Sequence, residues 1–194
     1  MKTIKFFAII LVVALLGSCE TKTIKLYPTI EENRIFYVAN DGYSNSLECI
    51  SVNQITEKIN DLEQDGEITA VFVEGIWIEL KKDAVKNEPL TTADSTKVNL
   101  YLMGWDGVKY LIVKDLVVDV TKDEQTLFLY NKIQKEAIVQ LRQMILDVAL
   151  GMNNKSEVCL ELVSENSPEG TYLNTTVNVF VKAAIEYAQE IESI

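Results

Sequence analysis

Four carboxylates on two expected strands form the only loose pool of residues suited to acid–base chemistry. Glu74 and Glu79 lie in one of these segments, and Asp115 and Asp119 lie in the other. Glycoside hydrolases use two carboxylates, one as general acid and the other as base or nucleophile. No spacing among these four residues is diagnostic of such a pair, and the chain has 29 acidic residues. A carboxylate-based hydrolase is therefore an alternative, and we assign no catalytic residue.

The chain contains no histidine. This excludes Ser-His-Asp and Cys-His catalysis and the imidazole ligands common in zinc sites. No cluster of ligands calls for a metal or another cofactor, and we expect neither. Glu74 is the strongest single candidate for chemistry because it interrupts the apolar face of its strand. The adjacent Gly75 favours a β-bulge that turns this carboxylate toward solvent instead.

Two cysteines could form a disulfide, and one tryptophan could form a binding surface. Cys49 and Cys159 permit one disulfide, but both have apolar neighbours, so free and half-buried thiols fit equally well. Trp105 lies in the turn Gly104–Gly107, where an indole is not needed for turn geometry. It either folds back over the end of the sheet, which is the favoured interpretation, or serves as an exposed platform for a sugar ring or a partner side chain.

The N-terminus has the pattern of an export signal. Lys2 and Lys5 precede an uninterrupted apolar run at residues 6–16. A membrane-spanning helix needs about 20 such residues, so the run is too short to span and has the proportions of a secretory signal. Gly17 and Ser18 close the run, and Cys19 follows directly.

The sequence Leu16-Gly17-Ser18-Cys19 resembles the lipobox of bacterial lipoproteins. The resemblance implies cleavage of residues 1–18 and acylation of Cys19, with residues 19–28 as an acylated tether. It also implies a bacterial cell-envelope location with the membrane as a partner through the lipid anchor. We expect the outer membrane, on its periplasmic or its surface face.

The formal net charge of −11 bears on partners. Such acidity opposes binding to polyphosphates, so we expect no nucleic-acid partner. The acidic residues are dispersed, as on a solvated surface. The triplet Asp94-Ser95-Thr96 resembles a short O-glycosylation motif of exported bacterial proteins, although an unmodified surface loop is the favoured interpretation.

Periodicity predicts a single α+β domain over residues 29–194. Alternating apolar residues predict strands, and apolar residues at three- and four-residue spacing predict helices. A capping-box pattern opens each of the first two helices. We expect strands at 34–39, 47–50, 67–80, 97–103, 108–120 and 157–163, and helices at 52–64, 122–152 and 174–194. The expected fold is an antiparallel or mixed sheet packed against a long central helix and a C-terminal helix.

These observations favour a non-catalytic binding or assembly module of the cell envelope. Its partner would be a glycan, a peptide or another envelope protein, and the sequence does not decide its oligomeric state. The alternatives are the carboxylate-based hydrolase and a purely structural envelope protein. Trp105 and Glu74 are the candidate binding residues.

Overall fold

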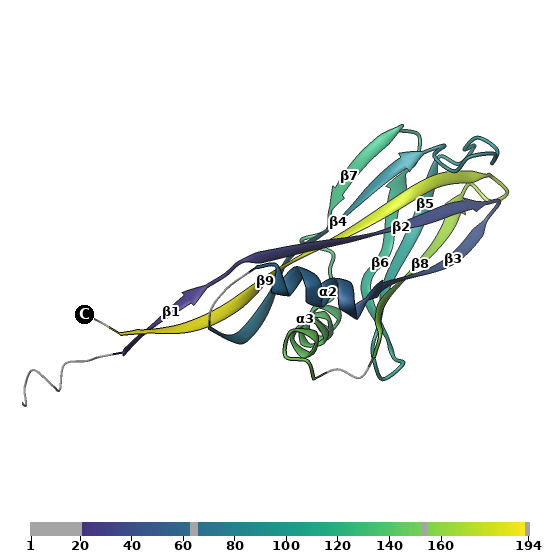
Figure 1. The fold of residues 1–194 in the computed structure, drawn as a ribbon. Coiled ribbons are helices and arrows are strands. Elements are labelled where there is room, and N and C mark those ends of the chain that lie inside the picture. Colours follow the sequence, from purple (N-terminus) through teal and green to yellow (C-terminus); the bar gives the residue numbers. More distant parts are fainter. Residues whose placement is uncertain (1–20, 63–65, 153–154, 193–194) are drawn as a thin grey trace, which may run out of the picture.

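The computed structural model describes residues 21–62, 66–152 and 155–192, which form mainly antiparallel β-sheet (Figure 1). Two helices accompany the strands in this part of the chain. The elements in chain order are β1 (Thr21–Leu26), β2 (Thr29–Asn40), β3 (Tyr43–Ser51), α2 (Val52–Asn60), β4 (Glu67–Lys82), β5 (Ser95–Met103), β6 (Lys109–Asp119), β7 (Glu124–Phe128), α3 (Lys135–Ala149), β8 (Glu157–Ser167) and β9 (Leu173–Glu192).

The strands form two sheets. Sheet A has the order β2-β9-β4-β7, and β1 continues β2 along the same edge of β9. Sheet B has the order β3-β8-β5-β6. The turn at Asp41-Gly42 joins β2 to β3 and so leads the chain from sheet A into sheet B. Every pairing between these strands is antiparallel.

The core lies between the inner faces of the sheets, and the helices close it on one side (Figure 1). Helix α3 packs against β4, β5 and β6, while α2 packs against α3 and β3. Burying this much apolar side-chain area is the main favourable contribution to folding. The largest fully buried side chains come from both sheets, from α3 and from the loop after β7: Phe36, Ile76, Ile78, Leu100, Leu102, Ile112, Leu129, Met144, Leu162, Leu173 and Ile185.

The expected α+β fold is wrong, and the C-terminal segment shows why. Residues 173–192 form strand β9 instead of a helix, and β9 pairs with β1 and β2 on one edge and with β4 on the other. Helical spacing is present in this segment, but so is a stricter alternation. From residue 173 to residue 187 the odd positions are all apolar or threonine, and they face the core: Leu173, Thr175, Val177, Val179, Val181, Ala183, Ile185 and Tyr187. Such β-branched residues favour a strand between two partners.

The long central helix is also wrong in its first half. Residues 124–128 form β7 on the edge of β4, and α3 begins only at Lys135. Thr121 does not cap a helix, because its backbone N–H and its hydroxyl both donate to Asp119 Oδ1. This local turn directs the chain back toward sheet A.

Other predicted elements agree with the structure. The strands at 34–39, 67–80 and 157–163, the 97–120 hairpin and the 52–64 helix all appear, with shifted ends. In β4 the register shifts at Thr69 and at Glu74. Each extra residue reverses which positions face inward, so Val71 is buried before the second shift and Ile76 after it. The bulge expected beside Gly75 is therefore present.

The expected tether is partly structured. Residues 21–26 form β1, which together with the last part of β9 makes an arm extending from the body (Figure 1). Residues 1–18 and Cys19 lie outside the described residues. Within the described ranges, neither helix has the length and apolar character needed to cross a membrane.

Candidate functional site

Four aromatic side chains lie together on the outer face of sheet A. Trp77 of β4 pairs with Phe128 of β7 on one side and with Phe180 of β9 on the other. Tyr130 follows β7 and stacks on Phe128. Because side chains alternate between the faces of a strand, the buried neighbours Ile76 and Ile78 place Trp77 on the outer face. We call Trp77, Phe128, Tyr130 and Phe180 the aromatic ridge.

Continuous ring contacts hold the aromatic ridge together. The rings of Trp77 and Phe180 are parallel within 3°, with centroids 4.9 Å apart. Trp77 and Phe128 are 6.5 Å apart, and Phe128 and Tyr130 are 5.8 Å apart and parallel within 6°. Phe128 remains 61% exposed and Tyr130 64% exposed. The half-buried inner pair therefore supports an outer pair whose apolar surface faces solvent. Contiguous exposed apolar surface of this kind marks interaction sites.

The bulge at Glu74 borders the aromatic ridge. Glu74 is exposed, and its carboxylate forms an ion pair with Lys182 at 2.9 Å. Gly75 follows, and a Cβ at this position would lie 3.8 Å from Tyr130 Cε1, so the tyrosine ring covers the glycine. An aromatic ring over a strand glycine replaces the packing that the missing side chain does not supply. The structure thus puts Glu74 in a surface ion pair beside the ridge.

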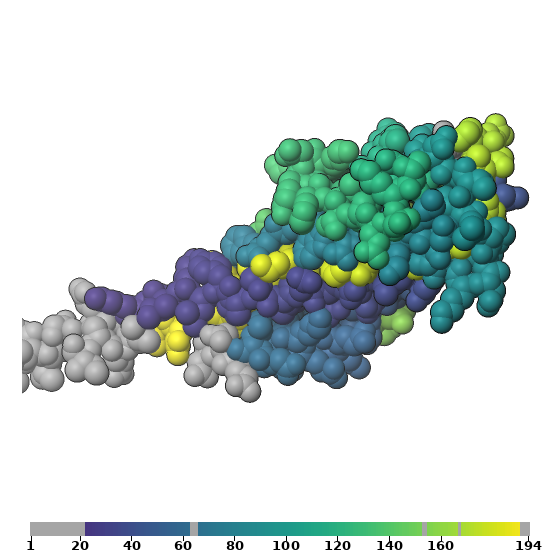
Figure 2. Space-filling view, turned by 90° about the horizontal axis from the view of Figure 1, so that it is seen from above, coloured from purple at the N-terminus to yellow at the C-terminus, as the bar shows by residue number. Residues whose placement is uncertain are grey.

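A polar groove lies next to the aromatic ridge on the same face. In the next row of side chains, Glu79 of β4 pairs with Asn178 of β9 and with Thr126 of β7. The groove encloses about 260 Å³. Figure 2 looks down on sheet A, with β9 visible as a yellow strip between β2 and the β4–β7 side. The residues lining the groove are Ile35, Glu79, Leu80, Lys81, Glu124, Gln125, Thr126, Thr176 and Asn178.

Most charged groups on this face are paired. Lys81 Nζ lies 3.0 Å from Glu124 Oε1, and Lys182 is paired with Glu74. Glu79 is exposed and has no ion-pair partner among the described residues. The polar groove and its border therefore carry a small net negative charge, which comes from Glu79.

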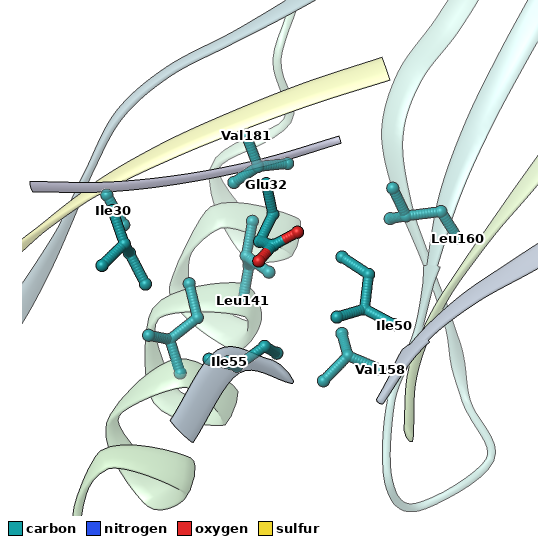
Figure 3. A pocket seen from close by; sticks show the side chains of 10 residues that line it. Ile30, Glu32, Ile50, Ile55, Leu141, Val158, Leu160 and Val181 are labelled. Carbon is teal, nitrogen blue, oxygen red and sulfur yellow. The ribbon is translucent and has the colours of Figure 1, made fainter. Parts of the chain in front are cut away.

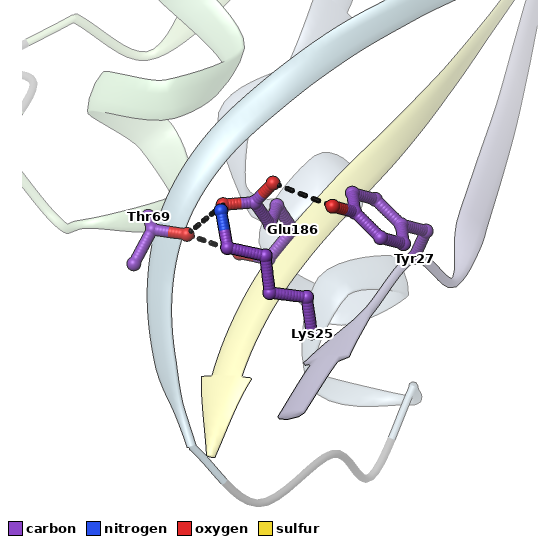
Figure 4. A network of polar contacts seen from close by, with 4 residues as sticks. All are labelled: Lys25, Tyr27, Thr69 and Glu186. Carbon is purple, nitrogen blue, oxygen red and sulfur yellow. Dashed lines mark hydrogen bonds and ion pairs between the residues drawn. The ribbon is translucent and has the colours of Figure 1, made fainter. Parts of the chain in front are cut away.

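A second polar cluster fixes the arm to the body. Glu186 of β9 is 6% exposed, and its carboxylate accepts hydrogen bonds from Thr69 Oγ1 at 2.6 Å, from Tyr27 Oη at 2.9 Å and from Lys25 Nζ at 3.0 Å (Figure 4). Thr69 is the first bulged residue of β4. The Thr69 hydroxyl, followed by Lys25 and Tyr27, lowers the pKa of Glu186 to about 2. This cluster joins β1 and β9 of the arm to β4, and no sequence pattern indicates it.

The interior pocket between α2, α3 and the two sheets is small and apolar (Figure 3). Its volume of about 40 Å³ is far below the roughly 300–1,000 Å³ of ligand pockets. The carboxylate of Glu32 points into it, and Glu32 Oε1 lies 2.9 Å from Lys58 Nζ. We interpret this space as imperfect core packing closed by an ion pair.

Trp105 packs against the core, whereas the outer rings of the aromatic ridge face solvent. It is half-buried, with its Nε1 atom buried. Its turn is closed by the Gly104 N–H donating to Val108 O. Asp106 Oδ1 accepts the Val108 N–H and Oδ2 accepts the Tyr110 hydroxyl, which together lower the pKa of Asp106. This geometry favours the covering role of Trp105 over that of a platform.

Cys49 and Cys159 are directly opposite each other on β3 and β8 and form a disulfide, with a Cα–Cα distance of 4.0 Å. The Glu157 carboxylate is close to both sulfur atoms. Disulfide sulfurs are not thiolates, and thiolates are what bind metals, so this group is not a metal site while the bond is intact.

The four candidate carboxylates do not lie together in one site. Glu74 and Glu79 lie on β4 in sheet A, whereas Asp115 and Asp119 lie on β6 in sheet B. Asp119 instead accepts the Thr121 hydroxyl and N–H, which lower its pKa. In the triplet at residues 94–96, the side chain of Thr96 is buried and donates to Glu165 O.

The sequence patterns do not indicate the aromatic ridge as a site. The helical patterns place Tyr130 and Phe180 on the apolar stripes of two expected helices, but Tyr130 lies in the loop after β7 and Phe180 lies in β9. One signal was present: the alternation that put Ile76 and Ile78 on the core face also put Trp77 on the other face. The ring neighbours of Trp77 come from other strands and carry no such signal.

Comparison with known proteins identifies no family. The sequence matches no protein-family profile, and no curated protein matches it. Solved structures that match include one titled Desmodium yellow mottle tymovirus, with 8% identity and a TM-score of 0.31 over 87% of this chain and 93% of the other. Another, turnip yellow mosaic virus, has 10% identity and a TM-score of 0.34 over 87% and 85%. A decameric BFDV capsid protein has 9% identity and a TM-score of 0.29 over 86% and 99%. Similarity at this level establishes neither a family nor a function.

Proposed function

We propose that this protein is a lipid-anchored, non-catalytic binding module of the bacterial cell envelope, and that the aromatic ridge is its binding surface. The observation that carries the proposal is the ridge itself. Phe128 and Tyr130 expose most of their surface and are held by an inner stacked pair. Aromatic residues are enriched among those that dominate binding energy.

The N-terminal sequence supports the anchor. Strand β1 begins two residues after Cys19 and lies in the arm, away from the body (Figure 1). An acylated Cys19 would therefore place the arm next to the membrane, with sheet A beyond it. The Glu186 cluster fixes β1 to β9 and β4, so the arm would hold the body in a defined orientation.

The disulfide supports an extracytoplasmic location. Disulfides persist in oxidising compartments such as the periplasm and the cell surface, and they are rare in the cytosol. The bond between Cys49 and Cys159 joins directly paired residues of sheet B, so the native fold holds the two sulfurs together.

The hydrolase alternative has less support from the geometry. Paired carboxylates act from opposite sides of one scissile bond. Here Asp115 and Asp119 lie in a different sheet from Glu79, and Glu74 is paired with Lys182. A purely structural role predicts that the aromatic ridge can be removed without loss of any binding.

The proposal is tested with the mature acylated protein in detergent micelles. Phe128→Ala/Tyr130→Ala removes the exposed half of the aromatic ridge. Binding to purified envelope fractions, separated into polysaccharide and protein, is measured by co-sedimentation and tryptophan fluorescence. We expect at least a tenfold loss of binding to one fraction. The free energy of unfolding should fall by less than about 3 kcal/mol, the upper end for the two ring pairs that the variant removes, Trp77–Phe128 and Phe128–Tyr130.

The matched control is Tyr43→Ala/Leu47→Ala on β3 of the other sheet. Tyr43 is 65% exposed, almost the same as Tyr130, and Leu47 is also exposed. This double variant should bind as the wild type does. If Phe128→Ala/Tyr130→Ala, the ridge variant, binds every fraction as the wild type does, the proposed function is wrong.

A further inference from the structure

We propose, on the basis of the function proposed above, that the ligand of the aromatic ridge is an uncharged glycan chain whose hydroxyl groups reach the polar groove. The ridge and the groove are adjacent rows on one face of sheet A. Trp77 and Glu79 are two residues apart on β4, as are Phe180 and Asn178 on β9. A ligand that covers the ridge therefore also meets the groove.

The chemistry of the two rows matches the two kinds of surface on a sugar. A pyranose ring has C–H bonds that pack against aromatic rings, and hydroxyl groups around its edge. The polar groove offers the Glu79 carboxylate as an acceptor and the Thr126 hydroxyl as both donor and acceptor. The Asn178 carboxamide is oriented by Asn33, whose Nδ2 donates to Asn178 Oδ1 at 3.0 Å. A preoriented amide binds hydroxyl groups at little entropic cost.

An apolar partner fits this face less well. Covering the groove with lipid or an apolar protein surface would remove water from Glu79 and supply no hydrogen bond. A buried polar group left unpaired costs about 1–3 kcal/mol, and a charged group costs more. Hydroxyl groups can replace that water, so a hydroxyl-rich ligand avoids the penalty.

The charge of the face opposes an anionic glycan. Two lysines near the ridge are paired, Lys81 with Glu124 and Lys182 with Glu74. Glu79 leaves a net negative charge, and the whole chain carries −11. A polymer of uronic acids or phosphates would be repelled by this negative charge, and the lysines at the groove and its border, Lys81 and Lys182, are already held by carboxylates. An uncharged glycan is neither repelled nor attracted by the charge of this face.

The arrangement also suits a chain of sugars rather than one ring. The ridge crosses three strands, β9, β4 and β7, and neighbouring strands are about 4.8 Å apart. This spacing is comparable to the length of one pyranose unit in an extended glycan. On an open sheet face each sugar makes contacts on one side only, so affinity comes from several successive units.

The test is affinity electrophoresis of the mature protein in detergent micelles through gels containing one polysaccharide each. The neutral probes are mixed-linkage β-glucan, galactomannan and dextran, and the anionic probes are polygalacturonate and alginate. We expect retardation by at least one neutral probe and by neither anionic probe. Raising salt from about 0.05 to 0.5 M should change the retardation less than twofold, because no ion pair forms with the ligand.

Variants distinguish the roles of the two rows. Phe128→Ala/Tyr130→Ala should abolish retardation, and Glu79→Ala should weaken it at least fivefold. Glu79→Gln keeps a hydrogen-bonding group without the charge and should retain binding within about twofold. Asp41→Ala, an exposed acidic residue in the β2–β3 turn, is the control and should have no effect.

Two failures are distinguishable. If envelope fractions still bind through the ridge but no neutral polysaccharide retards the protein, the glycan inference is wrong and the proposed function stands. Stronger retardation by polygalacturonate or alginate would also overturn the inference. If the ridge variant binds every fraction and probe as the wild type does, both proposals are wrong.

Discussion

Removing the disulfide should destabilise the protein by several kilocalories per mole. Cys49 and Cys159 are 110 residues apart in the sequence, and together they close a loop spanning most of the described chain. In the chain-entropy model, closing a loop of 110 residues in the unfolded state is worth about 4.8 kcal/mol at 25 °C. Folded domains are stable by only about 5–15 kcal/mol. The bond therefore supplies a large share of the total.

The assay is urea unfolding of wild type and Cys49→Ala/Cys159→Ala, followed by circular dichroism. We expect the variant to lose about 2–5 kcal/mol, since measured losses often fall below the entropic value. Both cysteines are only half-buried, so the cavity left by alanine contributes little. The midpoint of unfolding should fall while the native spectrum stays the same.

Reductant provides the internal control. Reduced wild type should unfold at nearly the same urea concentration as the variant, and reductant should not affect the variant. A loss below about 1 kcal/mol would refute the reasoning, because it would mean that the bond constrains little of the unfolded chain. A reduced wild type as stable as the oxidised form would refute it in the same way.

Three further outcomes are expected. The pKa of Glu186 is lowered to about 2 from its ordinary 4.5, so its stabilising contribution is complete above pH 4.5 and disappears as pH falls through about 2. Glu186→Gln should therefore be less stable than the wild type at pH 7. Urea titrations should show that this difference in the free energy of unfolding shrinks toward pH 2. Trp105→Ala should lower stability by about 3 kcal/mol without affecting ligand binding, and an unchanged unfolding midpoint would contradict its covering role. Cys19→Ala should block acylation and leave unprocessed or mislocalised precursor, whereas mass spectrometry of an unmodified N-terminus cleaved elsewhere would exclude the lipoprotein assignment.

Local signals predicted the local elements well. The bulge at Glu74 was readable because a glycine follows a charge in an otherwise apolar face. The helix at residues 52–60 has apolar residues at helical spacing and a serine cap, and Ser51 Oγ does accept the Asn53 N–H. The 95–119 hairpin has an alternating first arm, a second arm that is apolar on both faces and a glycine-rich turn. Each of these features depends on residues close together in the sequence.

Strand β9 shows where local signals were insufficient. Residues 173–192 carry both a helical and an alternating apolar pattern, and either could bury an apolar face. The choice depends on partners far away in the sequence, because β2 and β4 supply hydrogen bonds to both edges. Once both edges are paired, β-branched residues on the inner face pack better in a strand than in a helix.

The sequence by itself determined the absence of histidine, the acidic charge and the elements whose contacts are local, and it predicts an export signal. Only the tertiary structure decided the two-sheet fold, the disulfide and the candidate site. Trp77, Phe128 and Phe180 meet because three strands pair side by side. Strand pairing is set by non-local hydrogen bonds and by register, and a shift of one residue would move each ring to the opposite face. No pattern within one segment contains that information, so the aromatic ridge exists only in the folded chain.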